Sequence, residues 1–244
     1  MRLSICGNDE RSKSLKMLAE ERGIVLTDIS PDAVILPLPK SKLADLKRIY
    51  PNHQLMIAGK AEDALKEAAE RNGWRLLDAL EDEAFVRENA ELTAEGAIYH
   101  AMKEKKKALC KGKSMVLGYG RIGRYLTKML RGLGTEVTVC ARSEKARKEA
   151  GESSVDIKEM ERVIGEMDFI FNTIPYPVLM EKELKKMNKN ALLMELASSP
   201  YGVDMEAAAR LNVKVHLESG IPGRYCPMDA AEAFMKLIER SVSS

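Results

Sequence analysis

The sequence is poor in three residue types that build particular classes of protein. Only 5% of its 244 residues are aromatic, which argues against a stacking platform for single-stranded nucleic acid. Its three histidines are widely spaced, so we expect no metal site. Its four cysteines form no CxxC pair and fit neither a zinc ribbon nor a small disulfide scaffold. Two of them, Cys6 and Cys140, fall in apolar runs and are expected to be buried thiols.

Long hydrophobic runs and an excess of one charge are also missing. No apolar run approaches the roughly 18 residues of a membrane helix, and the first residues carry too short an apolar stretch for a signal peptide. The 39 basic and 37 acidic residues give a net charge of +2, so nothing in the overall charge points to nucleic acid or an anionic membrane as partner. With 45% hydrophobic residues, the composition predicts a cytoplasmic globular protein in two halves.

Short apolar runs alternate with helical periodicities along the chain. Strands are expected at residues 3–6, 33–38, 55–58 and 74–77, and then at 114–117, 136–140, 168–172, 191–196 and 213–217. Helices are expected at 12–22, 62–71 and 92–108, and then at 122–133, 159–166, 178–187, 204–211 and 228–240. This alternation implies right-handed βαβ units. We therefore predict an α/β protein with two doubly wound parallel-sheet domains, the C-terminal one a Rossmann dinucleotide-binding domain.

A lysine-rich stretch, EKKKALCKGK, separates the two halves. Its density of cations is compatible with a phosphate or polyanion patch. The simpler interpretation is a solvated helix end and linker, because cations are favoured at a helix C-terminus. We place a small α/β substrate-side domain at residues 1–91, a linking helix and linker at 92–113, and the dinucleotide-binding domain at 114–244.

One motif carries recognisable chemistry. The sequence GYGRIG, residues 118–123, follows a predicted strand, precedes an amphipathic helix and has a second strand at the right distance for dinucleotide binding. Gly118 allows the tight turn, Gly120 lets the pyrophosphate approach the backbone, and Gly123 permits close packing of helix on strand. The phosphates would then receive the free N–H groups of the helix N-terminus. The alternative is a glycine-rich turn without a ligand.

The end of the next strand distinguishes the two nicotinamide cofactors. Enzymes that prefer NAD usually carry an acidic residue there, which binds the ribose 2′-hydroxyl. Here the strand ends in Ala141, Arg142 and Ser143, with Lys145 just beyond, and no carboxylate would repel a 2′-phosphate. Arg142 can stack on adenine and bind that phosphate, so the sequence favours NADP over NAD. The alternative is an exposed strand-end cation in a permissive site.

Three more strand ends are expected at the same edge of the sheet, where ligands of doubly wound folds lie. The strand ends lie around Thr173, Leu196 and Glu218, and ordinary turn chemistry is the alternative for the loop at each. Residues 218–225 are predicted to be a loop that borders the nicotinamide pocket and the cleft between the domains. The predicted cofactor-binding set is Gly118, Gly120, Arg121, Ile122, Gly123, Ala141, Arg142, Ser143, Lys145, Thr173, Ile174, Pro175, Leu196 and Ala197.

These segments together resemble the A subunits of dipicolinate synthases. The resemblance covers residues 90–234 and rests on LTAEGAIYHAM, VLGYGRIG, VCARS, FNTIP, ELASSPYGVD and SGIPGRYCP. The N-terminal ICGNDER is similar to that family's strand and its Gly-x-Asp-x-Arg turn, here Gly7, Asp9 and Arg11. The fold also resembles the cofactor domains of D-2-hydroxyacid dehydrogenases and adenosylhomocysteinase.

The resemblance implies an oxidoreductase of spore-forming bacteria that takes a dihydrodipicolinate-type ring to dipicolinate, with NADP as hydride acceptor. Its implied partner is a flavoprotein-like B subunit, and a homo-oligomer is left open. Two features depart from the family: the first domain is short, and Glu218-Ser219-Gly220 stands where Ala-Pro-Gly is usual. Because a carboxylate near a dicarboxylate substrate repels it, either Glu218 points away or the substrate differs.

A dicarboxylate substrate calls for cationic side chains, hydroxyls or backbone N–H groups. The substrate-binding candidates are Asp9 and Arg11 from the first domain and Ser198, Ser199, Gly223 and Arg224 from the second. Arg11 would clamp a carboxylate and be oriented by Asp9. The alternative is a helix-start pair, since Asp9 is well placed near a helix N-terminus.

No general base is assigned, because His53, His100 and His216 are all expected to be structural or exposed. The Arg, Glu and His order of D-2-hydroxyacid dehydrogenases is not evident either. Two alternative functions therefore stay open. One is another NAD(P)-dependent small-acid dehydrogenase on the same scaffold, and the other is a non-catalytic NADPH-binding subunit.

Overall fold

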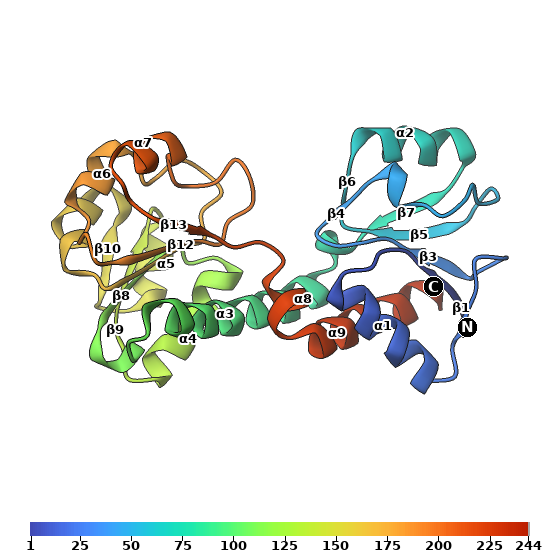
Figure 1. The fold of residues 1–244 in the computed structure, drawn as a ribbon, viewed down its shortest axis with the longest axis horizontal. Helices are drawn as coiled ribbons and strands as arrows, with labels where there is room; N and C mark the ends of the chain where they lie inside the picture. The colour runs from blue at the N-terminus through green and yellow to red at the C-terminus, as the bar shows by residue number, and fades with distance from the viewer. Residues whose placement is uncertain (244) are drawn as a thin grey trace. The chain divides into compact units, whose positions relative to one another are not determined.

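Parallel strands form every sheet of the protein, as the alternation of apolar runs and helices predicted. The computed structural model describes residues 1–243 and divides the chain into two compact units (Figure 1). The first unit comprises Met1–Leu92 and the chain from Gly220 onward, and the second comprises Thr93–Ser219. Helix α3 (Glu83–Lys105) carries the chain from one unit into the other. Within residues 1–243, no helix combines the length and the apolar character that crossing a membrane requires.

The first unit is built on a five-stranded sheet in the order β2-β1-β3-β5-β7. The strands are β1 (Arg2–Ile5), β2 (Val25–Leu26), β3 (Ala33–Ile35), β5 (Leu55–Ala58) and β7 (Arg75–Asp78), and β4 (Lys40–Ser41) pairs separately with β6 (Lys60–Ala61). The helices are α1 (Glu10–Glu21), α2 (Asp63–Asn72), α8 (Ile221–Tyr225) and α9 (Pro227–Val242), with 3₁₀ turns η1 (Leu43–Asp45) and η2 (Ala79–Glu81). Counted along the chain, this is the doubly wound 2-1-3-4-5 order.

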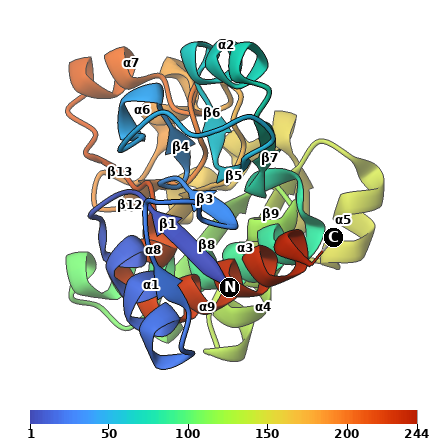
Figure 2. The same cartoon turned by 90° about the vertical axis from the view of Figure 1, so that its right-hand side faces the viewer.

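Alternate residues of a strand point to opposite sides of its sheet. Both sets are apolar in β3 and β5, so both faces of this sheet are buried against helices. Leu3, Ile35 and Ile57 belong to a core that includes the buried faces of α1 and α9. Val34 and Met56 belong to a second core that includes α2. Figure 2 shows α2 on the opposite side of the sheet from α1 and α9. The result is a three-layer α/β/α unit.

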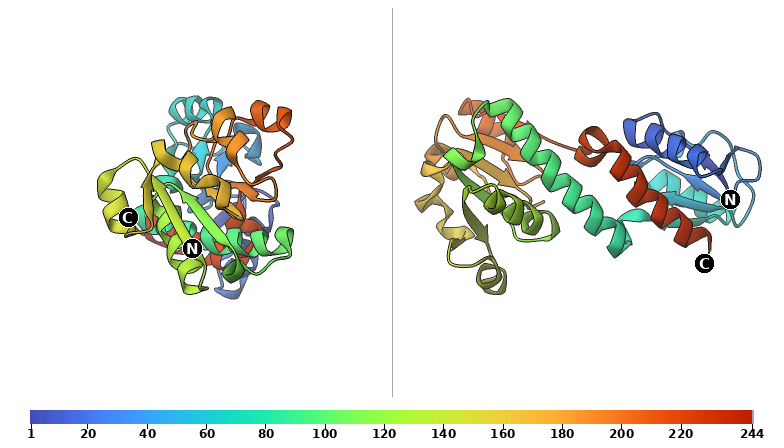
Figure 3. Two further views of the ribbon diagram at one scale, coloured as in Figure 1. Left: turned by 90° about the vertical axis from the view of Figure 1, so that its left-hand side faces the viewer. Right: turned by 90° about the horizontal axis from the view of Figure 1, so that it is seen from below.

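The C-terminal helix belongs to the first unit, which corrects the predicted extent of the cofactor domain, 114–244. Helix α9 packs beside α1 (Figure 3), and Arg22, the residue directly after α1, forms ion pairs with Glu232 at 2.6 Å and Glu239 at 2.8 Å. Periodicity identifies the helix, but it does not say on which sheet the apolar face of that helix packs. The first boundary, expected after residue 91, falls after Leu92.

The second unit is built on a six-stranded sheet in the order β10-β9-β8-β11-β12-β13. The strands are β8 (Lys113–Leu117), β9 (Glu136–Ala141), β10 (Ser154–Asp156), β11 (Phe169–Asn172), β12 (Leu192–Glu195) and β13 (Val215–Leu217). The helices are α4 (Arg121–Gly132), α5 (Glu144–Ala150), α6 (Glu181–Lys186) and α7 (Met205–Arg210), with 3₁₀ turns η3 (Leu109–Lys111), η4 (Ile157–Arg162) and η5 (Ile164–Glu166). Counted along the chain, this is the Rossmann order 3-2-1-4-5-6.

Several elements differ from the predicted ones. The short strands β2 and β10 and the polar helix α5 lack the continuous apolar run or periodicity that predicts a buried element. Helix α3 begins at Glu83 instead of at the predicted residue 92. Residues 159–166 form 3₁₀ turns instead of an α-helix. The predicted loop 218–225 contains α8, which belongs to the first unit and not to the cofactor domain.

Candidate functional site

The turn between β8 and α4 has the geometry that the GYGRIG motif predicted. Gly118 has φ +92°, a conformation that L side chains rarely adopt. A Cβ on Gly123 would lie 2.2 Å from the carbonyl oxygen of Gly118, so only glycine allows the helix to start this close to the strand end. Thr173, at the end of β11, donates its hydroxyl to the Leu117 carbonyl at 2.8 Å and holds the next loop against this turn.

Gly120 differs from these two glycines, because a Cβ built on it meets no atom within 4 Å. Packing therefore does not require glycine at this position. The open space lies directly before the N-terminus of the twelve-residue helix α4, where backbone N–H groups favour an anion. The turn thus offers the cradle that a pyrophosphate needs, and the residues present fit a nicotinamide dinucleotide.

The end of β9, which is expected to bind the 2′-phosphate, is held in place by a side chain of the following helix α5. Arg147 of α5 donates to the carbonyl oxygens of Ala141 and Arg142, each at 2.8 Å, and forms an ion pair with Asp156 at 2.8 Å. The backbone at Arg142 is thereby fixed, while its side chain is exposed. Ser143 caps α5 by accepting from the Ala146 N–H at 3.4 Å, which is a structural role the sequence did not reveal.

The cations at this strand end are available to a ligand. Arg142 and Lys145 are both exposed, and neither forms an ion pair with any of residues 1–243. Arg124, by contrast, pairs with Glu149 and stacks on the Tyr119 ring, 4.6 Å from its centroid. The structure therefore leaves the two predicted phosphate-binding side chains without a competing carboxylate.

A buried carboxylate organises the loop after β12, and the sequence analysis missed it. Glu195 is fully buried and accepts from the Asn172 amide at 2.8 and 2.9 Å. It also accepts from the backbone N–H groups of Ala197, Gly202 and Val203, at 2.9, 2.9 and 3.1 Å. Burial raises the pKa of Glu195, although the hydrogen bonds from these four donor groups oppose that shift. The available signal was a polar residue closing each of two apolar strands, FIFN and LLME.

This network places the other predicted residues of the second unit. Leu196 and Ala197 are buried behind the loop, whereas Ser198 and Ser199 are exposed on it. The predicted nicotinamide-side residues Thr173 and Ile174 are half-buried and Pro175 is exposed. They follow β11, which pairs with β8 and β12 on either side. The Rossmann switch point, where ligands bind in this fold, lies between β8 and β11.

The first unit carries a separate cavity at its own switch point, beyond β1 and β3. It has a volume of about 330 Å³ and is lined by Asp9, Glu10, Arg11, Leu38, Gly220, Gly223 and Arg224. Four predicted substrate residues, Asp9, Arg11, Gly223 and Arg224, therefore meet inside one unit. The prediction that Gly223 and Arg224 come from the cofactor domain is wrong, because both lie on α8.

Arg11 is the unusual side chain of this cavity. It is only 8% exposed, its Nη2 donates to Asn89 at 3.0 Å, and its Nε has no hydrogen-bond partner. Burial lowers the pKa of the guanidinium to about 10. A buried charge with an unsatisfied donor is costly unless a ligand completes it, so Arg11 points to an anionic ligand.

Asp9 does not orient Arg11, which corrects that part of the prediction. Its carboxylate caps α1, accepting from the Ser12 N–H at 3.1 Å and the Ser12 hydroxyl at 2.7 Å. Asn89 of α3 orients the guanidinium instead, and it lies too far along the sequence for spacing to suggest the pair.

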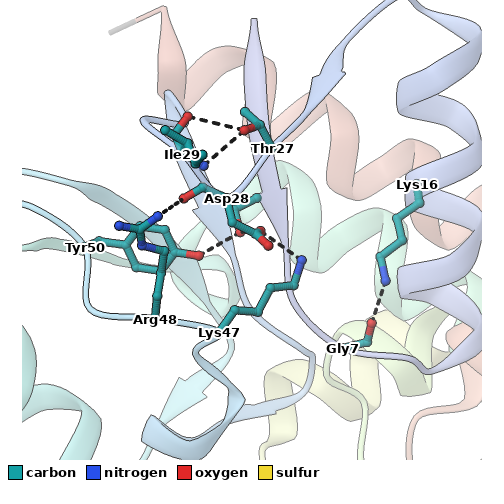
Figure 4. Close-up of polar contacts among 9 residues, drawn as sticks. Gly7, Lys16, Thr27, Asp28, Ile29, Lys47, Arg48 and Tyr50 are labelled. Atoms are coloured by element: carbon teal, nitrogen blue, oxygen red, sulfur yellow. Dashed lines mark hydrogen bonds and ion pairs between the residues drawn. The ribbon is translucent and has the colours of Figure 1, made fainter.

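A second polar cluster in the first unit has a structural role. The Asp28 carboxylate accepts from the Ser4 hydroxyl at 2.7 Å and from Lys47 at 2.9 Å, and these hydrogen bonds lower its pKa (Figure 4). Tyr50 closes the cluster with an O···O distance of 2.8 Å to Ser4. The charges therefore neutralise one another, and this cluster ties the loop after β2 to the segment before β5.

The comparisons with known proteins agree with this architecture. Residues 83–211 match the family model of the D-isomer specific 2-hydroxyacid dehydrogenase, NAD binding domain. The chain is 28% identical to the A subunit of dipicolinate synthase from Bacillus subtilis over 221 residues, which is 89% of this chain and 72% of that protein. It is 38% identical to a glyoxylate reductase of Thermococcus litoralis over 92 residues, 34% of this chain and 27% of that one.

The solved structures support the same fold. The crystal structure of the dipicolinate synthase A subunit from Bacillus halodurans has a TM-score of 0.87 at 22% identity, covering 100% of this chain and 98% of that one. The corresponding chain from Bacillus subtilis has a TM-score of 0.85. The predicted resemblance to these subunits is thus confirmed, as is the α/β fold class.

Proposed function

Since the chain belongs to the D-isomer specific 2-hydroxyacid dehydrogenase family through its NAD-binding domain, we propose that it oxidises a dihydrodipicolinate-type ring to dipicolinate with NADP. A nicotinamide-dependent dehydrogenase is what the family supports directly. The observation that carries the finer proposal is the buried Arg11 guanidinium, whose Nε lacks a partner beside a cavity large enough for a small carboxylate.

The chemistry divides simply between cofactor and protein. A nicotinamide dinucleotide bound at the Gly118–Gly123 turn would supply the hydride acceptor, and the ring would also lose a proton from a neighbouring atom to become an aromatic pyridine. Aromatic stabilisation supplies much of the driving force, so the protein mainly has to hold the ring and its carboxylates in place. Arg11, in the cavity of the first unit, would bind one carboxylate of the substrate.

The preference for NADP rests on Arg142. Its side chain is exposed at the end of β9 on a fixed backbone, with Lys145 one turn further along α5. A 2′-phosphate would receive charge-assisted hydrogen bonds from both, whereas NAD would leave them unused. Arg142→Glu should weaken NADPH binding about 10- to 100-fold, equivalent to about 1.4–2.8 kcal/mol, and change NADH binding much less.

Fluorescence titration with NADPH and NADH tests this choice. Arg131→Glu, an exposed arginine at the other end of α4, is the matched control for the change in net charge. NADPH binding no tighter than NADH binding in the unaltered protein would rule out the proposed preference, as would equal effects of the two substitutions.

The substrate is tested by assaying dipicolinate formation from a dihydrodipicolinate source and NADP. The assay is run with and without the flavoprotein-like B subunit, which we propose as partner. Product in either condition supports the proposal. Absence of product in both, together with NADPH-dependent reduction of glyoxylate, would favour the second candidate, a small-acid dehydrogenase, which the match to glyoxylate reductases suggests.

A further inference from the structure

Two histidines and one glutamate of the second unit converge although the sequence separates them widely. The Nε2 atom of His100, on α3, lies 3.4 Å from Nδ1 of His216, on β13, and 3.2 Å from Oε1 of Glu218. All three potential ligand atoms lie within 4.8 Å of one another. His100 and Glu218 are each only 8% exposed, so the group lies inside the unit.

The two separations that involve His100 match those between ligands of a tetrahedral metal site, and the third pair lies within 4.8 Å. Ligand atoms about 2.0–2.1 Å from a zinc ion and at tetrahedral angles lie about 3.3–3.4 Å apart. His100 Nε2 carries either one proton or one lone pair, so it cannot serve Glu218 and His216 as donor at once without sharing that proton.

Charge also favours a cation at this point. Glu218 places a carboxylate in a buried position, and Glu104 adds a second, with Oε2 3.8 Å from His216 Nδ1. Lys214, 3.6 Å from Glu104, is 77% exposed and partly offsets the charge of that outer carboxylate. A bound cation would offset the negative charge that remains on the buried Glu218.

We propose that His100, His216 and Glu218 bind a divalent transition-metal ion, with Zn²⁺ the best match. Two imidazoles and one carboxylate are borderline ligands that suit Zn²⁺ better than Mg²⁺ or Ca²⁺, which prefer oxygen ligands alone. Water would take the fourth position, because Glu104 lies outside the group whose ligand atoms are within 4.8 Å of one another. The ion would cross-link α3 to the edge strand β13, joining positions 116 residues apart, and stabilise the second unit by closing that long loop.

This proposal explains the residue that departed from the dipicolinate synthase pattern. Glu218 was expected to repel a dicarboxylate unless it pointed away. Its carboxylate instead faces His100 within the second unit, where a bound cation would neutralise it. The substitution of an acidic residue for the usual alanine thus supplies a ligand.

The test measures metal binding by the full chain. Zinc content after purification is determined by mass spectrometry, and affinity by titrating Zn²⁺ or Co²⁺ into chelator-treated protein. The variants are His100→Gln and Glu218→Gln, with His53→Gln as control, because His53 is an exposed histidine of the first unit. NADPH titration of each variant reports whether the second unit is folded.

One metal ion per chain is expected in the unaltered protein and in His53→Gln, with affinity at least about 100-fold lower in the other two. The Co²⁺ adduct should show the intense visible absorption of four-coordinate cobalt. Absence of stoichiometric binding, unchanged affinity in His100→Gln and Glu218→Gln, or equal loss in His53→Gln would each overturn the proposal. If those two variants fail to fold, a weak six-coordinate Co²⁺ spectrum of the unaltered protein would overturn it as well.

Discussion

The side-chain amide of Asn172 donates to both carboxylate oxygens of Glu195, at 2.8 and 2.9 Å, across the neighbouring strands β11 and β12. Gly202 must be glycine beside this pair, because a Cβ there would lie 2.2 Å from the Asn172 amide nitrogen. Two strand ends and the returning loop are therefore locked together by one carboxylate. The hydrogen bonds of Glu195 to Ala197 and Gly202 therefore also fix the positions of the exposed Ser198 and Ser199, which lie between them.

Glu195→Gln should destabilise the protein by about 3 kcal/mol. The side-chain amide of glutamine replaces one acceptor oxygen by an NH₂ group. The N–H groups that now donate to that oxygen would lose their acceptor and stay buried without a partner. Urea denaturation measures the effect. Glu206→Gln, at an exposed position on α7, is the matched control. A difference of under about 0.5 kcal/mol between the two variants would contradict the role of the network.

Gly120 and Gly123 should respond oppositely to alanine. Gly123→Ala places a Cβ 2.2 Å from the Gly118 carbonyl oxygen and should cost about 1–3 kcal/mol of stability. Gly120→Ala meets open space and has φ −80°, so the fold should tolerate it, while nucleotide affinity should fall at least about 10-fold. Thermal unfolding and NADPH titration of both variants separate the effects. Unchanged nucleotide affinity in Gly120→Ala would show that the pyrophosphate does not bind at this turn.

The cysteines should differ sharply in reactivity. Burial raises the pKa of the Cys140 thiol to about 12, so only about one molecule in three thousand carries the thiolate at pH 8.5, whereas Cys110 is exposed. Because burial also raises the pKa of Cys6, neither buried thiol should react in the native state. Mass spectrometry after iodoacetamide treatment should find Cys110 modified, and Cys6 and Cys140 intact until urea is added. Prompt native labelling of Cys140 would contradict its burial.

Sequence patterns predicted the features that arise from local spacing. The turn at Gly118, the strand end at Arg142 and the buried thiols each depend on a few consecutive residues, and the structure places them as expected. The strands of both large sheets were predicted wherever an apolar run is long enough. Short edge strands such as β10 were missed, because they form by pairing with a neighbouring strand and their own composition does not predict them.

The missed features join residues that only tertiary packing brings together. Arg11 meets Asn89 and the α8 residues because α9 returns to cover the first sheet, and no periodicity specifies that return. His100 and His216 lie in elements of quite different type and are neighbours only in space. Wide spacing of histidines along a sequence is therefore weak evidence against a shared site.

Arg11→Met should separate ligand binding from stability in the first unit. The substitution removes a guanidinium that burial disfavours and keeps much of the side-chain volume, so stability should stay equal or rise. Stabilisation by added dipicolinate should disappear, whereas the unaltered protein should gain about 2.7 kcal/mol at 100 times the dissociation constant.

Urea denaturation with and without dipicolinate measures both quantities. Arg75→Met, at an exposed arginine of the same unit outside the cavity, is the control and should keep the ligand effect. The pKa of Arg11 is about 10 in the folded protein, which is lower than in the unfolded chain. Above that pH the folded state loses this proton first, so the unfolded state binds more protons than the folded state and stability rises with pH. The cost of the buried charge should therefore diminish there, and the stability gained by Arg11→Met should shrink toward high pH. Loss of several kcal/mol at pH 7, with the response to dipicolinate intact, would show that Arg11 is a structural residue and not the carboxylate clamp.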